Sequence, residues 1–103
     1  MVVEYIRYRV PTERQREFED SYAEARAALD QSPHCLAYEI SHGIEEPENY
    51  VVRIEWDSLE GHEQGFRNSP GFGPFFAAVK PFFQQIEEMR HYEPTSLRST
   101  GER

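Results

Sequence analysis

Residues 50–76 limit the possible folds most strongly, because a strand pattern and two helix patterns follow one another there. From residue 50 onward, every second side chain is large and apolar, which predicts a strand with one buried face formed by Tyr50, Val52, Ile54 and Trp56. This strand ends on the single tryptophan of the chain. A large aromatic side chain is therefore expected at the end of a buried strand face.

Two helices are expected after this strand. Asp57 can cap the first helix, with Glu60 three residues later in the capping-box position. One side of that helix is expected to carry Leu59, His62 and Phe66. Ser69 followed by Pro70 marks a second helix start. Apolar residues then recur at steps of four, three and four along one face: Phe72, Phe76, Val79 and Phe83. The stretch therefore brings a tryptophan, a histidine and an aromatic stripe together, and would build most of any pocket.

The rest of the chain predicts three more strands and a long helix. Residues 2–10 are rich in branched and aromatic side chains and predict a strand. Residues 12–30 carry apolar side chains at helical spacing and predict an amphipathic helix. Residues 35–42 form a second strand, which a polar loop joins to the strand that ends at the tryptophan. Residues 85–93 are expected to form the fourth strand.

The order strand, helix, strand, strand, helices, strand is that of a ferredoxin-like βαββαβ arrangement. This is an α+β fold with one antiparallel sheet and helices on one face only. A chain of 103 residues is one domain. We expect residues 1–93 to form that domain and the Ser-, Thr-, Arg- and Gly-containing residues 94–103 to form a flexible tail. Pro81 is expected to kink or end the last helix.

The two faces of the predicted sheet differ in chemistry. Even-numbered strand positions hold most of the large apolar residues and are assigned to the helix-covered face. Odd-numbered positions mix both charge signs with a few apolar groups, including Arg7, Arg9, Arg53 and Glu55. We expect this second face to pack against its own two-fold copy, with the arginines paired to glutamates, because only 38% of the residues are apolar. The alternative is a solvated face with scattered ion pairs, each worth roughly 0.2–1 kcal/mol.

The net charge and the apolar pattern exclude several classes of partner. A formal net charge of −8 argues against nucleic acids and anionic membrane surfaces, which are themselves polyanionic. No apolar run approaches membrane-spanning length, and the first residues lack the pattern of a signal peptide. The single cysteine, Cys35, excludes an internal disulfide and a cysteine-cluster metal site. A cytoplasmic protein is expected.

The run from Tyr50 to His62, followed by Asn68-Ser-Pro-Gly-Phe72, resembles the antibiotic biosynthesis monooxygenase (ABM) family over about the first 93 residues. The strand-ending tryptophan of that family corresponds to Trp56, and its histidine-bearing helix to His62. The resemblance implies a dimeric α+β barrel in which two sheets pack face to face. It also implies oxygenation of an electron-rich polycyclic phenol or quinol by O2, without a metal, flavin or other cofactor.

Such chemistry needs an apolar pocket for a flat ring and a group that helps to ionise a phenol. The ring-binding candidates are Tyr38, Trp56, Phe66, Phe72 and Phe76. The candidates for catalysis are His62, Arg90 and Tyr8, with Glu4 and Tyr92 as further substrate-binding residues. Arg90 and Tyr92 share even parity on the last strand, and Glu4 lies on the neighbouring first strand, within reach of Arg90.

Each candidate also has a purely structural interpretation. Trp56 can plug the core, His62 can lie at the rim, and the phenylalanine stripe is core in any case. Glu4 and Arg90 can form a simple buried pair, although such pairs are poor stabilisers. The remaining histidines are assigned no role: His34, His42 and His91.

The haem-degrading branch of the same fold uses an asparagine, a tryptophan and a histidine ligand at positions that fall here on Ile6, Phe66 and Phe75. Phenylalanine cannot ligate iron, so haem degradation is disfavoured. Two hypotheses remain. The chain is either a small cofactor-independent monooxygenase acting on an aromatic, polyketide-like or quinol substrate, or a non-catalytic ligand-binding or accessory barrel protein.

Overall fold

The computed structural model describes residues 1–99 and contains the predicted elements in the predicted order. The strands are β1 (Val2–Arg9), β2 (Cys35–His42), β3 (Asn49–Trp56) and β4 (Ile86–Tyr92). The helices are α1 (Gln15–Gln31), α2 (Phe72–Val79), the π-helix η2 (Gly61–Phe66) and the 3₁₀ segments η1 (Thr12–Arg14) and η3 (Lys80–Gln85). Residues 93–99 are neither helix nor strand, and residues 100–103 of the predicted tail lie outside the described residues.

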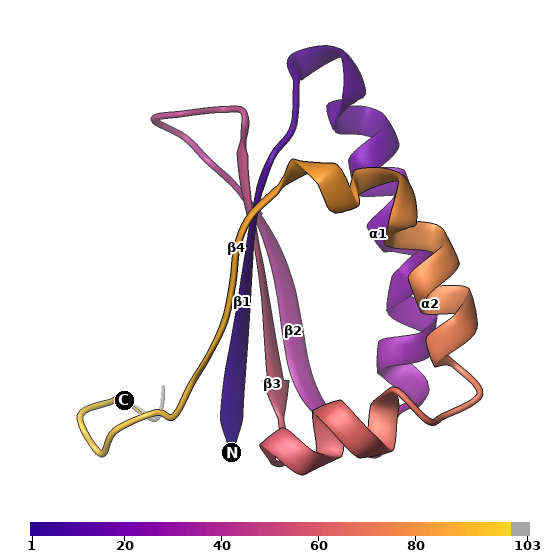
Figure 1. Ribbon diagram of the computed structural model, residues 1–103. Coiled ribbons are helices and arrows are strands. Elements are labelled where there is room, and N and C mark those ends of the chain that lie inside the picture. Colours follow the sequence, from indigo (N-terminus) through magenta and orange to yellow (C-terminus); the bar gives the residue numbers. More distant parts are fainter. Residues whose placement is uncertain (100–103) are drawn as a thin grey trace.

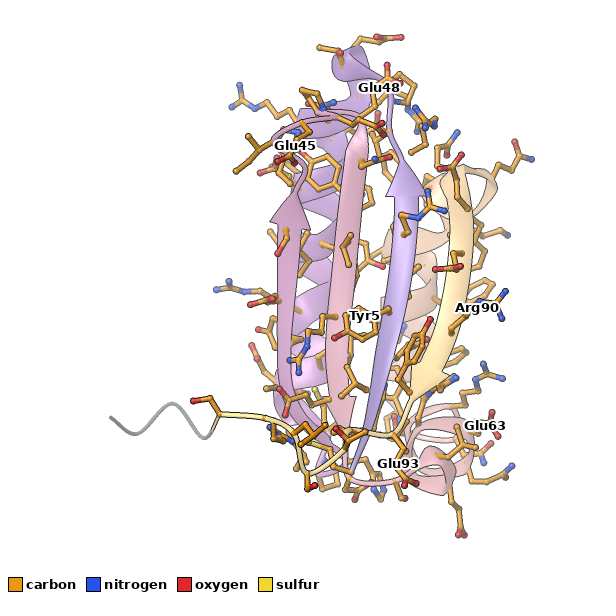
Figure 2. All side chains as sticks on the ribbon, turned by 90° about the vertical axis from the view of Figure 1, so that its left-hand side faces the viewer. Tyr5, Glu45, Glu48, Glu63, Arg90 and Glu93 are labelled. Carbon is orange, nitrogen blue, oxygen red and sulfur yellow. The ribbon has the colours of Figure 1, made fainter. Side chains whose placement is uncertain are left out.

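The four strands form one antiparallel sheet in the order β2-β3-β1-β4. Figure 1 shows α1 and α2 side by side against one face of this sheet, with the η2 segment crossing its lower end. Figure 2 views the opposite face, where no helix lies in front of the strands. The predicted ferredoxin-like α+β fold is therefore confirmed. Within residues 1–99, no helix is long and apolar enough to cross a membrane.

The core lies between the sheet and the helices. From Glu4 onward in β1 and throughout β3, the even-numbered side chains are buried as the alternation predicts: Glu4, Ile6, Tyr8, Tyr50, Val52, Ile54 and Trp56. The start of β1 differs, because Val2 is half-buried and the odd-numbered Val3 is buried. From α1, the buried side chains are Phe18, Tyr22, Ala25 and Leu29. The pattern is weaker on the edge strand β2, where Leu36 is 56% exposed and Tyr38 is half-buried.

Strand β4 departs from the predicted alternation because its pairing with β1 contains a β-bulge. Arg7 lies opposite Glu88, whereas the next residue, Tyr8, lies opposite Ile86. Glu87 is the extra residue, and one extra residue inverts the faces of everything that follows. Met89 and His91 therefore face the helices. The assignment of Arg90 and Tyr92 to the helix-covered face was wrong.

The helix ends differ from the predicted caps. The Ser58 hydroxyl, not Asp57, accepts the Gly61 N–H at 2.9 Å. The Asp57 carboxylate instead meets His34 Nδ1 at 2.9 Å. The Ser69 hydroxyl donates to the Phe66 carbonyl at 2.7 Å, and α2 begins only at Phe72. The prediction for Pro81 is confirmed, because α2 ends at Val79 and a 3₁₀ segment follows.

The open face of the sheet carries ion pairs within the chain. Arg7 Nη1 lies 2.6 Å from Glu87 Oε1, and Arg53 Nη1 lies 2.6 Å from Glu55 Oε2. Arg9 meets both Glu87 and Glu48. The glutamate partners that the sequence analysis placed on a second subunit are thus available on the same subunit. In the middle of this face, Tyr5 points away from the helices (Figure 2).

Candidate functional site

A cavity of about 450 Å³ lies between the sheet and the helices η2 and α2. Its walls are mainly aromatic and aliphatic, and the tryptophan and phenylalanine side chains among them are Trp56, Phe66, Phe72, Phe75, Phe76 and Phe83. Phe76 and Phe83 are each 37% exposed and pack edge to face with ring centroids 4.9 Å apart. The cavity therefore combines a buried aromatic interior with a partly open aromatic side.

Glu4 and His62 form a polar patch in this apolar wall. Their exposed fractions are only 3% and 6%, although both are ionisable. The Trp56 indole N–H donates to Glu4 Oε1 at 3.1 Å. The His62 ring stacks on the Trp56 ring with centroids 4.5 Å apart, which places His62 Nε2 at 3.6 Å from Glu4 Oε1. Trp56 thus positions the Glu4 carboxylate by a hydrogen bond and the His62 imidazole by ring stacking.

His91 completes this polar patch from β4. It lies opposite Glu4 in the β1–β4 pairing, and its Nε2 is 2.8 Å from His62 Nδ1, so one ring donates a hydrogen bond to the other. One ligand atom from each of Glu4, His62 and His91 lies within 4.8 Å of the others, so these three side chains could hold a metal ion. Glu4 and His62 line the cavity, and His91 lies behind them in contact with His62. The sequence analysis missed His91 because the bulge at Glu87 cannot be seen in the alternation of the sequence.

Burial changes the protonation of Glu4 and His62. It raises the pKa of Glu4, while the Trp56 hydrogen bond and the electrostatic effects of His91 and Arg67 act in the opposite direction. Burial, with smaller electrostatic contributions from His91 and Arg67, lowers the pKa of His62 to about 4. The imidazole of His62 is therefore neutral at neutral pH.

Two tyrosine hydroxyls lie elsewhere in the cavity wall. Tyr8 and Tyr22 share a hydrogen bond of 2.6 Å between their hydroxyl oxygens. Burial raises the pKa of Tyr8 to about 12 and raises that of Tyr22 as well. Both hydroxyls stay protonated at neutral pH, so they can donate hydrogen bonds but cannot act as bases.

A positive charge stands at the cavity, on the exposed residue Arg67 that follows η2. Its guanidinium acts on the pKa of both Glu4 and His62, as described above. An anionic group formed in the cavity would also be attracted to it. Arg67 gave no sequence signal, because a single arginine after an aromatic helix is common surface chemistry.

Seven of the ten predicted site residues line the cavity: Glu4, Tyr8, Trp56, His62, Phe66, Phe72 and Phe76. The other three do not. Tyr38 lies on β2, and its hydroxyl donates to Asp30 Oδ1 of α1 at 2.6 Å. Arg90 pairs with Glu88 at 3.3 Å and Tyr92 packs against Tyr5, both away from the helices. The predicted proximity of Arg90 to Glu4 was wrong, since the residue beside Glu4 is His91.

A family model described as antibiotic biosynthesis monooxygenase matches residues 1–78. The chain belongs to the ABM family. A curated relative, the uncharacterised protein YczJ of Bacillus subtilis (strain 168), is 27% identical over 79 residues, which cover 77% of this chain and 83% of YczJ.

Solved structures of ABM proteins and of other proteins share the fold. SnoaB, a cofactor-independent oxygenase from Streptomyces nogalater, matches with a TM-score of 0.72 and 20% identity, over 98% of this chain and 97% of SnoaB. A conserved protein from Methanosarcina mazei matches with a TM-score of 0.74 and 18% identity, over 91% of this chain and 92% of the other. At these identities the likeness shows the fold of this ABM protein and not its substrate.

Proposed function

We propose that this ABM protein is a cofactor-independent monooxygenase that oxidises an electron-rich, hydroxylated polycyclic aromatic or quinol substrate with O2. The observation that carries the proposal is an aromatic cavity with a buried carboxylate beside an imidazole in its wall. Membership of the ABM family supports the reaction class. The description of SnoaB as a cofactor-independent oxygenase supports it too, although that description applies to SnoaB.

The cavity suits a flat aromatic molecule. Its volume of about 450 Å³ falls in the range of small-molecule pockets. Phe66 is almost fully buried, whereas Phe76 is partly exposed, so one end of the site is closed and the other is open. A ring system entering past Phe76 would contact aromatic edges and faces on both sides. Its hydroxyl groups would meet either the Glu4 and His62 patch or the Tyr8 and Tyr22 hydroxyls.

Glu4 is the proposed base. Its ionised form is held by the Trp56 N–H and favours the His62 tautomer that carries a proton on Nε2, facing the carboxylate. In this tautomer His62 Nδ1 accepts the hydrogen bond from His91 Nε2. The raised pKa of Glu4 brings its basicity closer to that needed to accept a proton from a phenol. His62 and Trp56 then act by positioning the carboxylate. Glu4, and not the predicted catalytic candidate His62, is therefore the residue proposed to accept the proton.

The oxidation itself uses the electrons of the substrate. Loss of a proton to Glu4 gives a phenolate or carbanion, which transfers one electron to O2. The resulting radical and superoxide combine to form a C–O bond, and the peroxide loses water. In an anthrone, one ring CH2 becomes C=O, and the second oxygen atom leaves as water with the two hydrogens. Tyr8 and Arg67 can stabilise the negative charge during these steps, by hydrogen bonding and by electrostatic attraction.

We also infer that two copies pair through the open sheet face to form a homodimer. Tyr5, Arg7 and Val51 lie half-buried on this face, and Tyr92 beside them is 49% exposed. The inferred domain is residues 1–93. Pro94, Thr95, Leu97, Arg98 and Ser99 line a hollow together with Val3, Tyr5 and Arg53 at one end of the face, so a second copy would meet the rest of it.

Oxygen consumption with an anthrone or a naphthoquinol tests the proposed activity. We expect uptake above the buffer rate, and a reduction of about 10²–10⁴-fold in the Glu4→Gln variant, which keeps the shape of the side chain. Glu63→Gln is the matched control, because Glu63 is exposed on η2 next to His62 (Figure 2). Uptake that never exceeds the buffer rate, with both variants folded, would refute the enzyme and favour a ligand-binding protein.

A further inference from the structure

We propose that Glu4, His62 and His91 form a binding site for a divalent transition-metal ion, which would take the place of the hydrogen bond between the two histidines. The three side chains come from β1, η2 and β4, and their ligand atoms all lie within 4.8 Å of one another. Two atoms bound to one Zn²⁺ lie about 4 Å apart at most, since each metal–ligand bond is about 2 Å. A contraction of less than an ångström therefore converts the cluster into a three-ligand site.

The ligand set decides the class of metal. Two imidazoles and one carboxylate suit Zn²⁺, Fe²⁺ and Co²⁺, whereas Mg²⁺ and Ca²⁺ prefer oxygen ligands. His62 Nδ1 and His91 Nε2 are already 2.8 Å apart, and His62 Nε2 is 3.6 Å from Glu4 Oε1. Either nitrogen of His62 can thus share an ion with one of its neighbours.

The surroundings have the features of a metal site with an open position. The Trp56 N–H holds Glu4 Oε1 at 3.1 Å, which is the kind of outer hydrogen bond that orients a ligating carboxylate. Glu4 and His62 also line the cavity, so a further coordination position can face that space. Three protein ligands with an open fourth position characterise catalytic or exchangeable sites rather than closed structural ones.

Charge favours occupation as well. The Glu4 carboxylate is 3% exposed, and within residues 1–99 it has no arginine or lysine among its hydrogen-bond partners. A buried carboxylate without a paired cation is costly, and a dication removes that cost. The neutral imidazole of His62 is the form that binds metals. Arg67 opposes the ion, but its side chain is exposed and therefore screened by water.

A bound metal ion would also affect the proposed oxygenase activity, and this consequence alone rests on the proposed function. A metal ion would use the lone pairs of Glu4 that accept the proton in the proposed proton transfer, and it would replace the hydrogen bonds by which His62 positions that carboxylate. Metal binding and proton abstraction are therefore mutually exclusive, and a bound metal ion inhibits the oxygenase. The binding itself does not depend on any oxygenase activity.

Calorimetric titration with Zn²⁺ tests the site, using protein without an affinity tag that has been treated with EDTA and dialysed. We expect one Zn²⁺ per chain, with the dissociation constant raised at least about tenfold in Glu4→Gln and in His91→Gln. His42→Gln is the matched control and keeps the wild-type value, since His42 lies at the far end of β2 and bonds to the Pro47 carbonyl. Visible absorption of Co²⁺ provides a second readout, because its ligand-field bands change when imidazole coordinates.

The absence of stoichiometric binding would overturn the proposal, as would equal affinity in all four proteins. Circular dichroism of each variant shows whether it is folded, and the isosteric Glu4→Gln keeps the test valid if His91→Gln does not fold. Saturating Zn²⁺ is then expected to stop oxygen uptake, and EDTA to restore it. If no oxygen uptake exists at all, the proposed function fails while the titration still decides the metal site.

Discussion

His91 on β4 lies directly opposite Glu4 on β1, although its odd number assigns it to the other face of the sheet. The β-bulge at Glu87 causes this reversal and brings His91 Nε2 to 2.8 Å from His62 Nδ1. A single extra residue in one edge strand therefore replaces Arg90, which strict alternation would place beside Glu4, with a histidine. The chemistry of the cavity depends on that replacement.

Replacement of His91 and Arg90 by alanine compares two adjacent residues of β4. His91→Ala removes the hydrogen-bond partner of a buried ring and is expected to lower the free energy of unfolding by about 1–3 kcal/mol. Arg90→Ala removes only an exposed pair and is expected to change it by less than about 0.5 kcal/mol. Urea unfolding followed by circular dichroism measures both. A larger loss of unfolding free energy from Arg90→Ala than from His91→Ala would contradict the β-bulge at Glu87.

The pH dependence of stability reports on His62. Its pKa is lowered from 6.5 to about 4 in the folded protein, so the folded state binds fewer protons than the unfolded state between these values. His62 therefore contributes stability that is fully present above about pH 6.5 and is lost as the pH falls towards 4. Glu4, His91 and Arg67 face the same ring and shape this transition.

Two measurements check the behaviour of His62. Urea unfolding across this pH range should show a steeper dependence in the wild type than in His62→Gln. NMR titration of the His62 ring protons should give a midpoint well below 6. A midpoint near 6.5 would contradict the burial of a neutral imidazole beside Glu4.

Substitution of Phe76 and of Phe82 distinguishes the role of the cavity wall from that of the core. Phe76 lines the cavity and is 37% exposed, so Phe76→Ala is expected to raise KM about tenfold with little loss of stability. Phe82 is fully buried in the core, and Phe82→Ala is expected to cost about 3–5 kcal/mol of unfolding free energy. Steady-state kinetics and thermal melting measure the two effects. An unchanged KM in Phe76→Ala would place substrate elsewhere.

The inferred homodimer is tested by light scattering. We expect a mass of about 24 kDa, twice the 12.1 kDa of one chain, at micromolar concentration. Tyr5 lies in the middle of the open face, where it contacts Arg53 and Tyr92. Tyr5→Glu places a charge there and is expected to give the mass of a single chain. A wild-type protein that runs as a single chain would refute the pairing.

The sequence predicts the fold well because its strongest signals are periodic. Alternation identifies β3 and the buried side of β1, and steps of three and four identify α1 and α2. The contributions of Trp56 and Phe66 to one cavity follow from the same patterns. Both side chains are large and apolar, and the spacing of apolar residues around them assigns each to the buried face of its strand or helix.

Other parts of the site depend on features that no local pattern contains. The bulge at Glu87 is set by how β4 pairs with β1, so neither the inward position of His91 nor the outward position of Arg90 can be read from the sequence. Tyr38 lies on an edge strand and bonds to Asp30, which the alternation of β2 does not indicate. The approach of Arg67 to the cavity likewise depends on the turn that follows η2.

The proposed proton transfer from substrate to Glu4 can be observed without O2. An anaerobic absorption spectrum of a bound hydroxyanthrone distinguishes its phenol from its phenolate. At neutral pH the account predicts a phenolate spectrum with the wild-type protein and with Glu63→Gln, and a phenol spectrum with Glu4→Gln, all at saturating protein. The same phenolate spectrum with Glu4→Gln, or a phenol spectrum with the wild type, would contradict it.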